Sequence, residues 1–146
     1  MRSATVHETL QQDAVKYPEI SLPSGRVYAF PDARWTKYGT ATHRTAICNY
    51  PVQGFATADL LPIALVALEK AVRDANIRSV ICNTVHDSIV MDVHPDEKNI
   101  CIDLMKHAML SLPFETVRRY GIAYNMPVGI EIKAGKNWLD LHDVEL

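Results

Sequence analysis

A polar tripeptide between two strand-like runs places the strongest constraint on how this chain can fold. His86-Asp87-Ser88 separates residues 79–83 from residues 89–93, and both flanking runs are short and rich in Val and Ile. Because β-branched residues favour strands, the two runs are predicted to form the arms of a β-hairpin. The tip of that hairpin would hold the Asp87 carboxylate at a surface, where it can meet a metal ion.

Composition and charge describe an ordinary globular domain. The chain has 146 residues, of which 48% are hydrophobic and 22% charged, so it is long and apolar enough for one domain with a core. The formal charge of −2 gives no general affinity for nucleic acids or membrane surfaces. Any basic surface must therefore be local, and the best candidate group is Arg26, Arg34, Lys37, His43 and Arg44.

Cysteine usage and hydropathy predict a cytoplasmic protein with no membrane partner. Cys48, Cys82 and Cys101 are widely spaced, form no zinc-binding pattern and lie in apolar contexts, so all three are expected to be reduced and buried. No apolar run approaches membrane-spanning length, and no signal peptide is recognisable.

Hydrophobic periodicity and the positions of proline and glycine predict the other elements. In chain order we expect a helix over 4–17, a hairpin over 20–30, a loop over 31–40, a short helix over 41–48, a buried helix over 51–76, the central hairpin, a helix over 95–112, a turn or short helix over 113–120 and a strand over 127–133. Pro51 should be the first residue of its helix, and Pro62 should kink it. This order predicts an α+β domain with an antiparallel sheet.

The 95–112 helix is expected to turn one apolar face inward. The residues predicted to face the core are Ile100, Leu104, Met105, Ala108 and Met109.

Four segments, in the expected order, carry a family resemblance. Residues 49–60, Asn-Tyr-Pro-Val-Gln-Gly-Phe-Ala-Thr-Ala-Asp-Leu, resemble the N-x-P-x-Q-G-x-A-A-D segment of family A (polymerase I-like) DNA polymerases. Residues 85–88 resemble that family's V-H-D-E sequence, known as motif C. Residues 135–138 resemble its C-terminal G-x-x-W, and residues 22–26 resemble the G-R hairpin that follows its fingers helix. Together these segments span nearly the whole chain.

The resemblance implies the C-terminal part of a polymerase domain. Residues 1–48 would be the end of the fingers with its hairpin, and residues 49–146 would be the palm, with the motif C hairpin packed against helices. We find no motif A and no fingers helix with nucleotide-binding lysine and arginine. An N-terminal polymerase fragment is therefore an expected partner. Met1 is compatible with a split polymerase of the kind phage genomes carry, and equally with an excised fragment.

The resemblance also implies a two-metal mechanism. Nucleotidyl transfer uses two Mg²⁺ ions roughly 3.5–4 Å apart, held largely by carboxylates. Asp87 would be a catalytic metal ligand, and a second carboxylate must come from outside this chain. The alternative is a hydrated turn aspartate, since Asp favours turns. Asp92 and Asp96 are interpreted as a strand end and a helix first turn, with no role in the site.

Two neighbours of Asp87 have expected roles. His86 matches the family histidine that contacts the primer terminus; the alternative is a hairpin histidine bonded to backbone. Ser88 replaces the family's glutamate as an accessory group, so it would position a water or the primer end with less negative charge at the metal site.

Three residues near Pro51 are expected to contact DNA. Asn49 and Gln53 would place amides against the minor-groove acceptors that every correct base pair presents. The alternatives are helix capping by Asn49 and a solvated Gln53. Arg44 lies one position away from the family's primer-contacting arginine, whose place is taken by Thr45.

The function implied is template-dependent DNA synthesis on primer–template DNA with deoxynucleoside triphosphates. Three alternatives remain open: a non-catalytic palm remnant that binds DNA, a module that binds a partner protein, and a structural domain without a DNA role.

Overall fold

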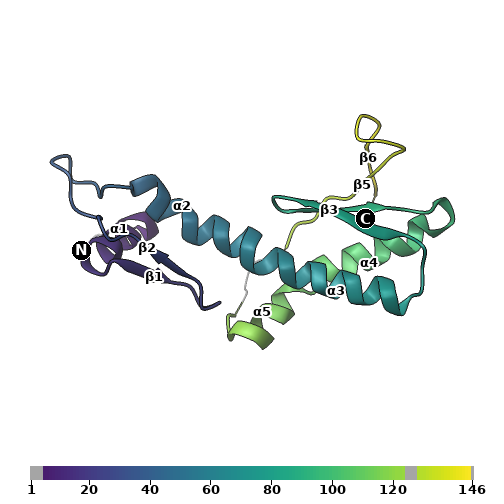
Figure 1. Ribbon diagram of the computed structural model, residues 1–146, viewed down its shortest axis with the longest axis horizontal. Helices are drawn as coiled ribbons and strands as arrows, with labels where there is room; N and C mark the ends of the chain where they lie inside the picture. The colour runs from purple at the N-terminus through teal and green to yellow at the C-terminus, as the bar shows by residue number, and fades with distance from the viewer. Residues whose placement is uncertain (1–4, 124–127, 146) are drawn as a thin grey trace. The chain divides into compact units, whose positions relative to one another are not determined.

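A computed structural model describes residues 5–123 and 128–145 and has an α+β fold (Figure 1). The chain divides into two compact units, Met1–Leu60 and Leu61–Leu146. The described strands form antiparallel two-stranded sheets, which confirms the predicted fold class. The division at Leu60 differs from the predicted fingers–palm boundary at residue 48, which remains a prediction about family regions.

The first unit combines helices with one hairpin. Its elements are α1 (Val6–Lys16), β1 (Glu19–Ser21), β2 (Val27–Ala29), α2 (Arg44–Gly54) and the π-helix η1 (Phe55–Leu60). A capping box starts α1, because the Thr5 hydroxyl accepts from the Glu8 N–H at 3.3 Å and the Glu8 carboxylate accepts from the Thr5 N–H at 2.7 Å. The core of this unit contains Ala14, Ile20, Phe30, Ala41 and Ile47.

A buried carboxylate ties the β1–β2 hairpin to the helical run. The hairpin turns at Gly25, whose φ of +86° favours glycine. Beside the turn, the Ser24 hydroxyl donates to Asp59 at 2.6 Å, and Arg26 donates from Nε at 2.9 Å. Arg26 Nη2 also lies 2.9 Å from the Asp59 carboxylate. Arg26 therefore belongs to an internal ion pair and not to the predicted local basic surface.

Of the two prolines in the helical run, Pro51 lies where the sequence did not predict it. Pro51 was expected to begin a helix, but it lies inside α2, which begins at Arg44 after His43. A proline inside a helix removes one N–H donor, and its ring crowds the preceding turn. Pro62 lies inside a helix as predicted, as the second residue of α3 (Leu61–Asp74), directly after the π-helix.

The helical run Arg44–Asp74 also corrects the hydropathy expectation. It has 31 residues and a window of mean hydropathy 1.5, so by length and composition alone it is a possible membrane span. Core helices of soluble proteins meet the same test, and 39% of that window is buried inside the protein.

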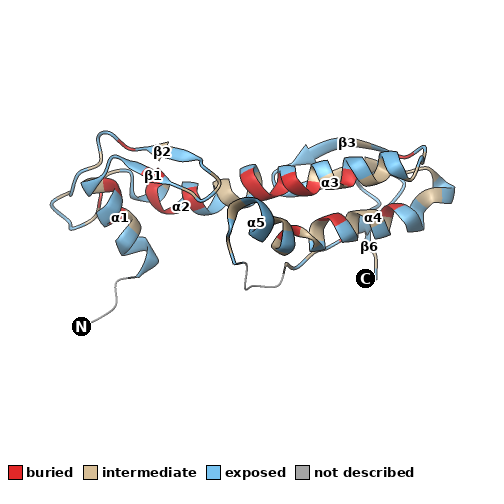
Figure 2. Ribbon diagram, turned by 90° about the horizontal axis from the view of Figure 1, so that it is seen from below, coloured by how far each residue is buried: buried red, intermediate tan, exposed pale blue. Residues whose placement is uncertain are grey.

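The second unit begins with α3 and carries the central hairpin. Its other elements are β3 (Val80–Val85), β4 (Ser88–Asp92), the 3₁₀ helix η2 (Pro95–Glu97), α4 (Lys98–Leu110), α5 (Leu112–Tyr120), β5 (Lys133–Ala134) and β6 (His142–Asp143). Helices α3 and α4 pack against each other, and Figure 2 shows buried residues along both. The predicted inward position of Ile100 is wrong, since Ile100 is exposed and its neighbour Cys101 is buried.

The C-terminal segment is extended but contains less strand than predicted. Of the expected strand 127–133, Pro127 lies outside the described residues, and only Lys133 is assigned to a strand. The predicted alternation holds at its end, where Ile132 is buried and Glu131 is exposed. Gly135 is required where the tail folds back, because a Cβ there would lie 1.8 Å from the Asp140 carbonyl oxygen.

Candidate functional site

Residues 85–88, which resemble motif C, lie on a tight hairpin, as the sequence predicts. Strands β3 and β4 are antiparallel, and Val85 pairs with Ser88, so His86 and Asp87 alone form the turn. The register shifts between Ile81 and Asn83, which makes Cys82 the extra residue of a β-bulge. Cys82 is exposed there, so its predicted burial is wrong; Cys48 and Cys101 are buried as expected.

The turn holds His86 in a strained backbone conformation. Its φ is +55°, in the left-handed region that residues other than glycine adopt in only a few per cent of cases. Two-residue hairpin turns require positive φ at their first central position and usually place glycine or asparagine there. A histidine in this conformation costs about 1 kcal/mol or more. Such strain persists only where the surrounding hairpin imposes it, so the position of Asp87 is set by the two strands.

Hydrogen bonds to the Glu97 carboxylate hold the base of the hairpin. The Glu97 carboxylate accepts from the Ser79 hydroxyl at 2.7 Å, from the Ser79 N–H at 2.9 Å and from the Arg78 N–H at 3.0 Å. These donors, the Ser79 hydroxyl first, lower the pKa of Glu97 to about 2. Glu97 therefore stays ionised and fixes the start of β3 to the beginning of α4.

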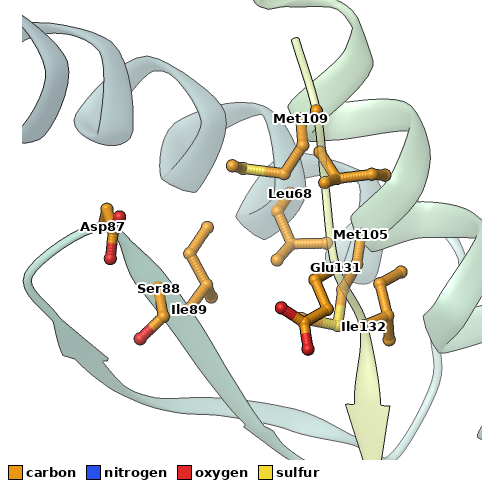
Figure 3. Close-up of a pocket in the computed structure, with 10 residues that line it drawn as sticks. Leu68, Asp87, Ser88, Ile89, Met105, Met109, Glu131 and Ile132 are labelled. Atoms are coloured by element: carbon orange, nitrogen blue, oxygen red, sulfur yellow. The ribbon is translucent and has the colours of Figure 1, made fainter. Parts of the chain in front are cut away.

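A hollow of about 350 Å³ opens beside the hairpin tip. Asp87 is exposed at its edge, next to Ser88, and Glu131 and Ile132 lie across from them (Figure 3). Most of the lining side chains are apolar. The lining residues are Leu68 of α3, Asp87, Ser88 and Ile89 of the hairpin, Met105 and Met109 of α4, and Gly129, Ile130, Glu131 and Ile132 of the extended segment.

Glu131 is the second carboxylate of this hollow, and sequence reasoning gave it no role. Lys133 Nζ lies 2.7 Å from the Glu131 carboxylate, and this hydrogen bond, with the charge of Lys133, lowers the pKa of Glu131. Glu131 is therefore ionised at neutral pH, with part of its charge offset by the lysine. The predicted alternation of residues 130–132 was the signal that Glu131 would lie on the wet face.

Ser88 is partly engaged within the turn. Its hydroxyl donates to the Val85 carbonyl oxygen at 2.8 Å. The lone pairs of the hydroxyl oxygen remain as acceptors, so Ser88 can still orient a water molecule but offers no carboxylate.

The described residues do not form a complete metal site by themselves. No group of three or more His, Cys, Asp or Glu side chains within 5–123 and 128–145 is arranged to hold a metal ion. The Asp87 carboxylate is exposed on the turn, and carboxylate oxygen is the kind of ligand that a hard cation such as Mg²⁺ prefers. A metal at this position would need further oxygen ligands from water, nucleotide or other protein groups.

The predicted DNA-contacting amides lie on one face of α2. Asn49 and Gln53 are four residues apart within the helix, and both are exposed. Asn49 does not cap the helix, because the N-terminal flanking residue is His43. Thr45, four residues before Asn49, shares their face, whereas Arg44 is exposed but projects away from it.

The π-helix η1 lies where residues 49–60 contain one residue more than the family pattern that they resemble. In the family pattern the aspartate follows the glutamine by five positions, but Asp59 follows Gln53 by six. A π-helical turn closes through i→i+5 bonds and so takes up one more residue than an α-helical turn. η1 spans Phe55–Leu60, where the count differs. Counting residues against the motif was the available signal, and the sequence interpretation missed it.

Comparison with a solved structure defines the class of protein. The fold matches the POL domain of Pol1 from M. smegmatis, in a complex with DNA primer-template and dNTP, with a TM-score of 0.61 and 29% sequence identity. The match covers 73% of this chain and 19% of that one. The chain thus has part of a DNA polymerase domain fold.

Sequence comparison supplies the family. The profile described as DNA polymerase family A matches residues 5–140, and this chain belongs to that family. DNA polymerase I of Lactococcus lactis subsp. cremoris is 30% identical over 133 residues, covering 91% of this chain and 13% of the relative. DNA polymerase of Bacillus phage SP01 is 33% identical over 98 residues, covering 67% and 10%. The chain therefore spans about a tenth of the length of these relatives, and the predicted family is confirmed.

Proposed function

We propose that this chain is the motif C-bearing portion of a DNA-directed DNA polymerase. It would act in template-dependent nucleotidyl transfer together with an N-terminal polymerase portion that supplies the other metal-binding carboxylate and the nucleotide-binding helix. Its substrates would be primer–template DNA and deoxynucleoside triphosphates, and its site of action the cytoplasm of a bacterium or of a phage-infected cell. Membership of family A supports the reaction class.

The single observation that carries the proposal is the placement of Asp87. The side chain is exposed on a two-residue turn and borders an open hollow, so a metal ion can reach it. Mg²⁺, which family A polymerases generally use, would lower the pKa of the primer hydroxyl and neutralise charge on the triphosphate. Asp87 would bind and orient such ions, and Ser88 would hold a water molecule beside them.

The other proposed contacts concern DNA. His86, held beside Asp87 by the same turn, would contact the primer terminus. Asn49 and Gln53 would donate to minor-groove acceptors from their common face of α2. Arg44, which projects from a different face, would contact a phosphate of the primer backbone through its guanidinium.

The test is primer extension with the chain, a complementary N-terminal portion of a family A polymerase, Mg²⁺ and all four nucleotides. Asp87→Ala should abolish extension, whereas the matched control Asp92→Ala, at the other end of β4, should retain it. Ser88→Glu should lower the Mg²⁺ concentration required, because it adds a carboxylate. Extension that survives Asp87→Ala would refute the proposed role.

A second candidate is a non-catalytic palm remnant that binds DNA or a partner protein. The serine at position 88 favours it, since its hydroxyl is bonded to Val85 and no carboxylate stands there. Salt-sensitive DNA binding without extension under any complementation would select this candidate.

A further inference from the structure

The loop between β2 and α2, residues 30–43, displays aromatic and cationic side chains together. Trp35 is 48% exposed and Tyr38 is 79% exposed, three residues further along. Lys37 Nζ lies 5.1 Å from the centre of the Tyr38 ring, a cation–π distance. The two exposed rings therefore lie close together in the sequence, with a cation beside one of them.

The loop that carries these exposed side chains is ordered by its own hydrogen bonds. Trp35 and Ala41 form an antiparallel bridge, and the Thr36 N–H donates to the Thr40 carbonyl at 2.8 Å. The Thr36 and Thr40 hydroxyls are 3.2 Å apart and hydrogen-bonded. The loop is thus a miniature hairpin whose tip carries Lys37, Tyr38 and Gly39, with Gly39 at a φ of +73°.

The miniature hairpin is also anchored to the core of its unit. The buried side chain of Gln11 donates to the His7 carbonyl at 3.1 Å and accepts from the Ala41 N–H at 3.0 Å. The Thr42 hydroxyl donates to the Asp32 carbonyl at 3.1 Å and accepts from the Arg34 N–H at 3.1 Å. These hydrogen bonds hold the loop backbone in place, and this backbone keeps the Trp35 and Tyr38 side chains exposed.

The local charge is opposite to that of the chain. The loop and the first residue of α2 carry three cations, Arg34, Lys37 and Arg44, against one carboxylate, Asp32, while the whole chain has a formal charge of −2. No ion pair joins Arg34 or Lys37 to a carboxylate in the part of the chain that the structure describes. This patch therefore attracts polyanions although the protein as a whole does not.

We propose that this loop binds single-stranded DNA, with unpaired bases stacked on Trp35 and Tyr38 and phosphates held by Arg34 and Lys37. Stacking needs the open face of a base, which duplex DNA hides within its own stack. Cations interleaved with aromatics match the alternation of phosphate and base along a single strand. The choice of DNA over other polyanions rests on the proposed polymerase function, where the unpaired strand would be template.

The tryptophans allow a direct binding assay on the full chain. There are two, Trp35 and Trp138, so Trp138→Phe leaves Trp35 as the sole indole reporter. Titration with a short oligo(dT) should quench Trp35 fluorescence to saturation. The reverse variant, Trp35→Phe, reports from Trp138 and should show no change.

Variants of the loop test stacking and charge separately. Tyr38→Ala should weaken binding about 5-fold to 150-fold, the effect of losing one base–aromatic stack. Tyr17→Ala is the matched control, because Tyr17 is 55% exposed and lies under Lys16 at 4.8 Å; it should leave binding unchanged. Arg34→Gln and Lys37→Gln should each reduce the salt slope by about 0.7.

Three outcomes would overturn the inference. These are an unchanged affinity in Tyr38→Ala, equal competition by a fully paired duplex, and a Trp35 signal that responds to anionic lipid vesicles but not to oligo(dT). Circular dichroism of each variant checks that the fold is retained. Asp87→Ala should bind oligo(dT) normally, so loss of extension without loss of binding separates this inference from the proposed polymerase role.

Discussion

The ion pair between Arg26 and Asp59 predicts an unequal response to removing either partner. The Asp59 side chain is 6% exposed and that of Arg26 is 40% exposed. Arg26→Met keeps the aliphatic stem but leaves a buried carboxylate with the Ser24 hydroxyl as its main remaining partner. Breaking a buried pair in this way costs about 3–5 kcal/mol, and we expect the lower end, because Arg26 is partly exposed.

Removing the charge on the other side should cost less. In Asp59→Asn the arginine can hydrate, and the amide oxygen can still accept a hydrogen bond, so the loss should be about 1.5 kcal/mol. The double variant buries no unpaired charge. Its destabilisation should therefore fall below the sum of the single effects by about 1–2 kcal/mol.

Urea unfolding followed by circular dichroism measures all of these free energies. Lys70→Met serves as the control, because the exposed Lys70–Asp74 pair within α3 should contribute about 0.5 kcal/mol or less. If Arg26→Met were no more damaging than Lys70→Met, or if the double variant were additive within about 0.5 kcal/mol, the reasoning about a buried, coupled pair would be refuted.

Further tests address other close contacts. Gly54→Ala places a Cβ 1.6 Å from the Tyr28 hydroxyl, so its free energy of unfolding, measured in urea, should fall by about 1–3 kcal/mol. In a Tyr28→Leu background the same substitution should slightly raise the free energy of unfolding, because alanine favours a helix more than glycine does. His86→Gly relieves the positive φ and should raise the melting temperature while reducing primer extension; a lower melting temperature would contradict the strain argument. The Glu97 carboxylate stabilises the fold fully above its ordinary pKa of 4.5, and this stabilisation is lost as the pH falls through about 2. The free energy of unfolding of Glu97→Gln should therefore depend less on pH between 4.5 and 2 than that of the unmodified protein.

Local sequence patterns predicted the β3–β4 hairpin well. The two β-branched arms around residues 86–88 favour strands, and the short polar tripeptide between them favours a turn, so neighbouring residues alone predict the hairpin. Proline was less informative. Pro51 satisfies the rules for a helix start, yet the surrounding residues of α2 continue the helix through it, so tertiary packing overrode a local preference.

The features that depend on distant residues were not predictable from one sequence. Asp59 and Arg26 are 33 positions apart, and nothing local indicates that their side chains meet. The bulge at Cys82 arises from a register shift between two strands, which periodicity within one strand cannot show. Glu131 was predictable as exposed, but its position across the hollow from Asp87 comes from the path of the C-terminal segment.

The two-stranded β3–β4 hairpin has a consequence for handling this protein. Within the described residues neither strand has another neighbour, so each outer edge presents backbone donors and acceptors in a row. Strand β3, Val-Ile-Cys-Asn-Thr-Val, contains no charge and no proline, and Val80 and Val85 are exposed. Such an edge pairs readily with another copy of itself. Purified alone, the chain should aggregate through β3, and a lysine introduced at Thr84 should suppress that self-association.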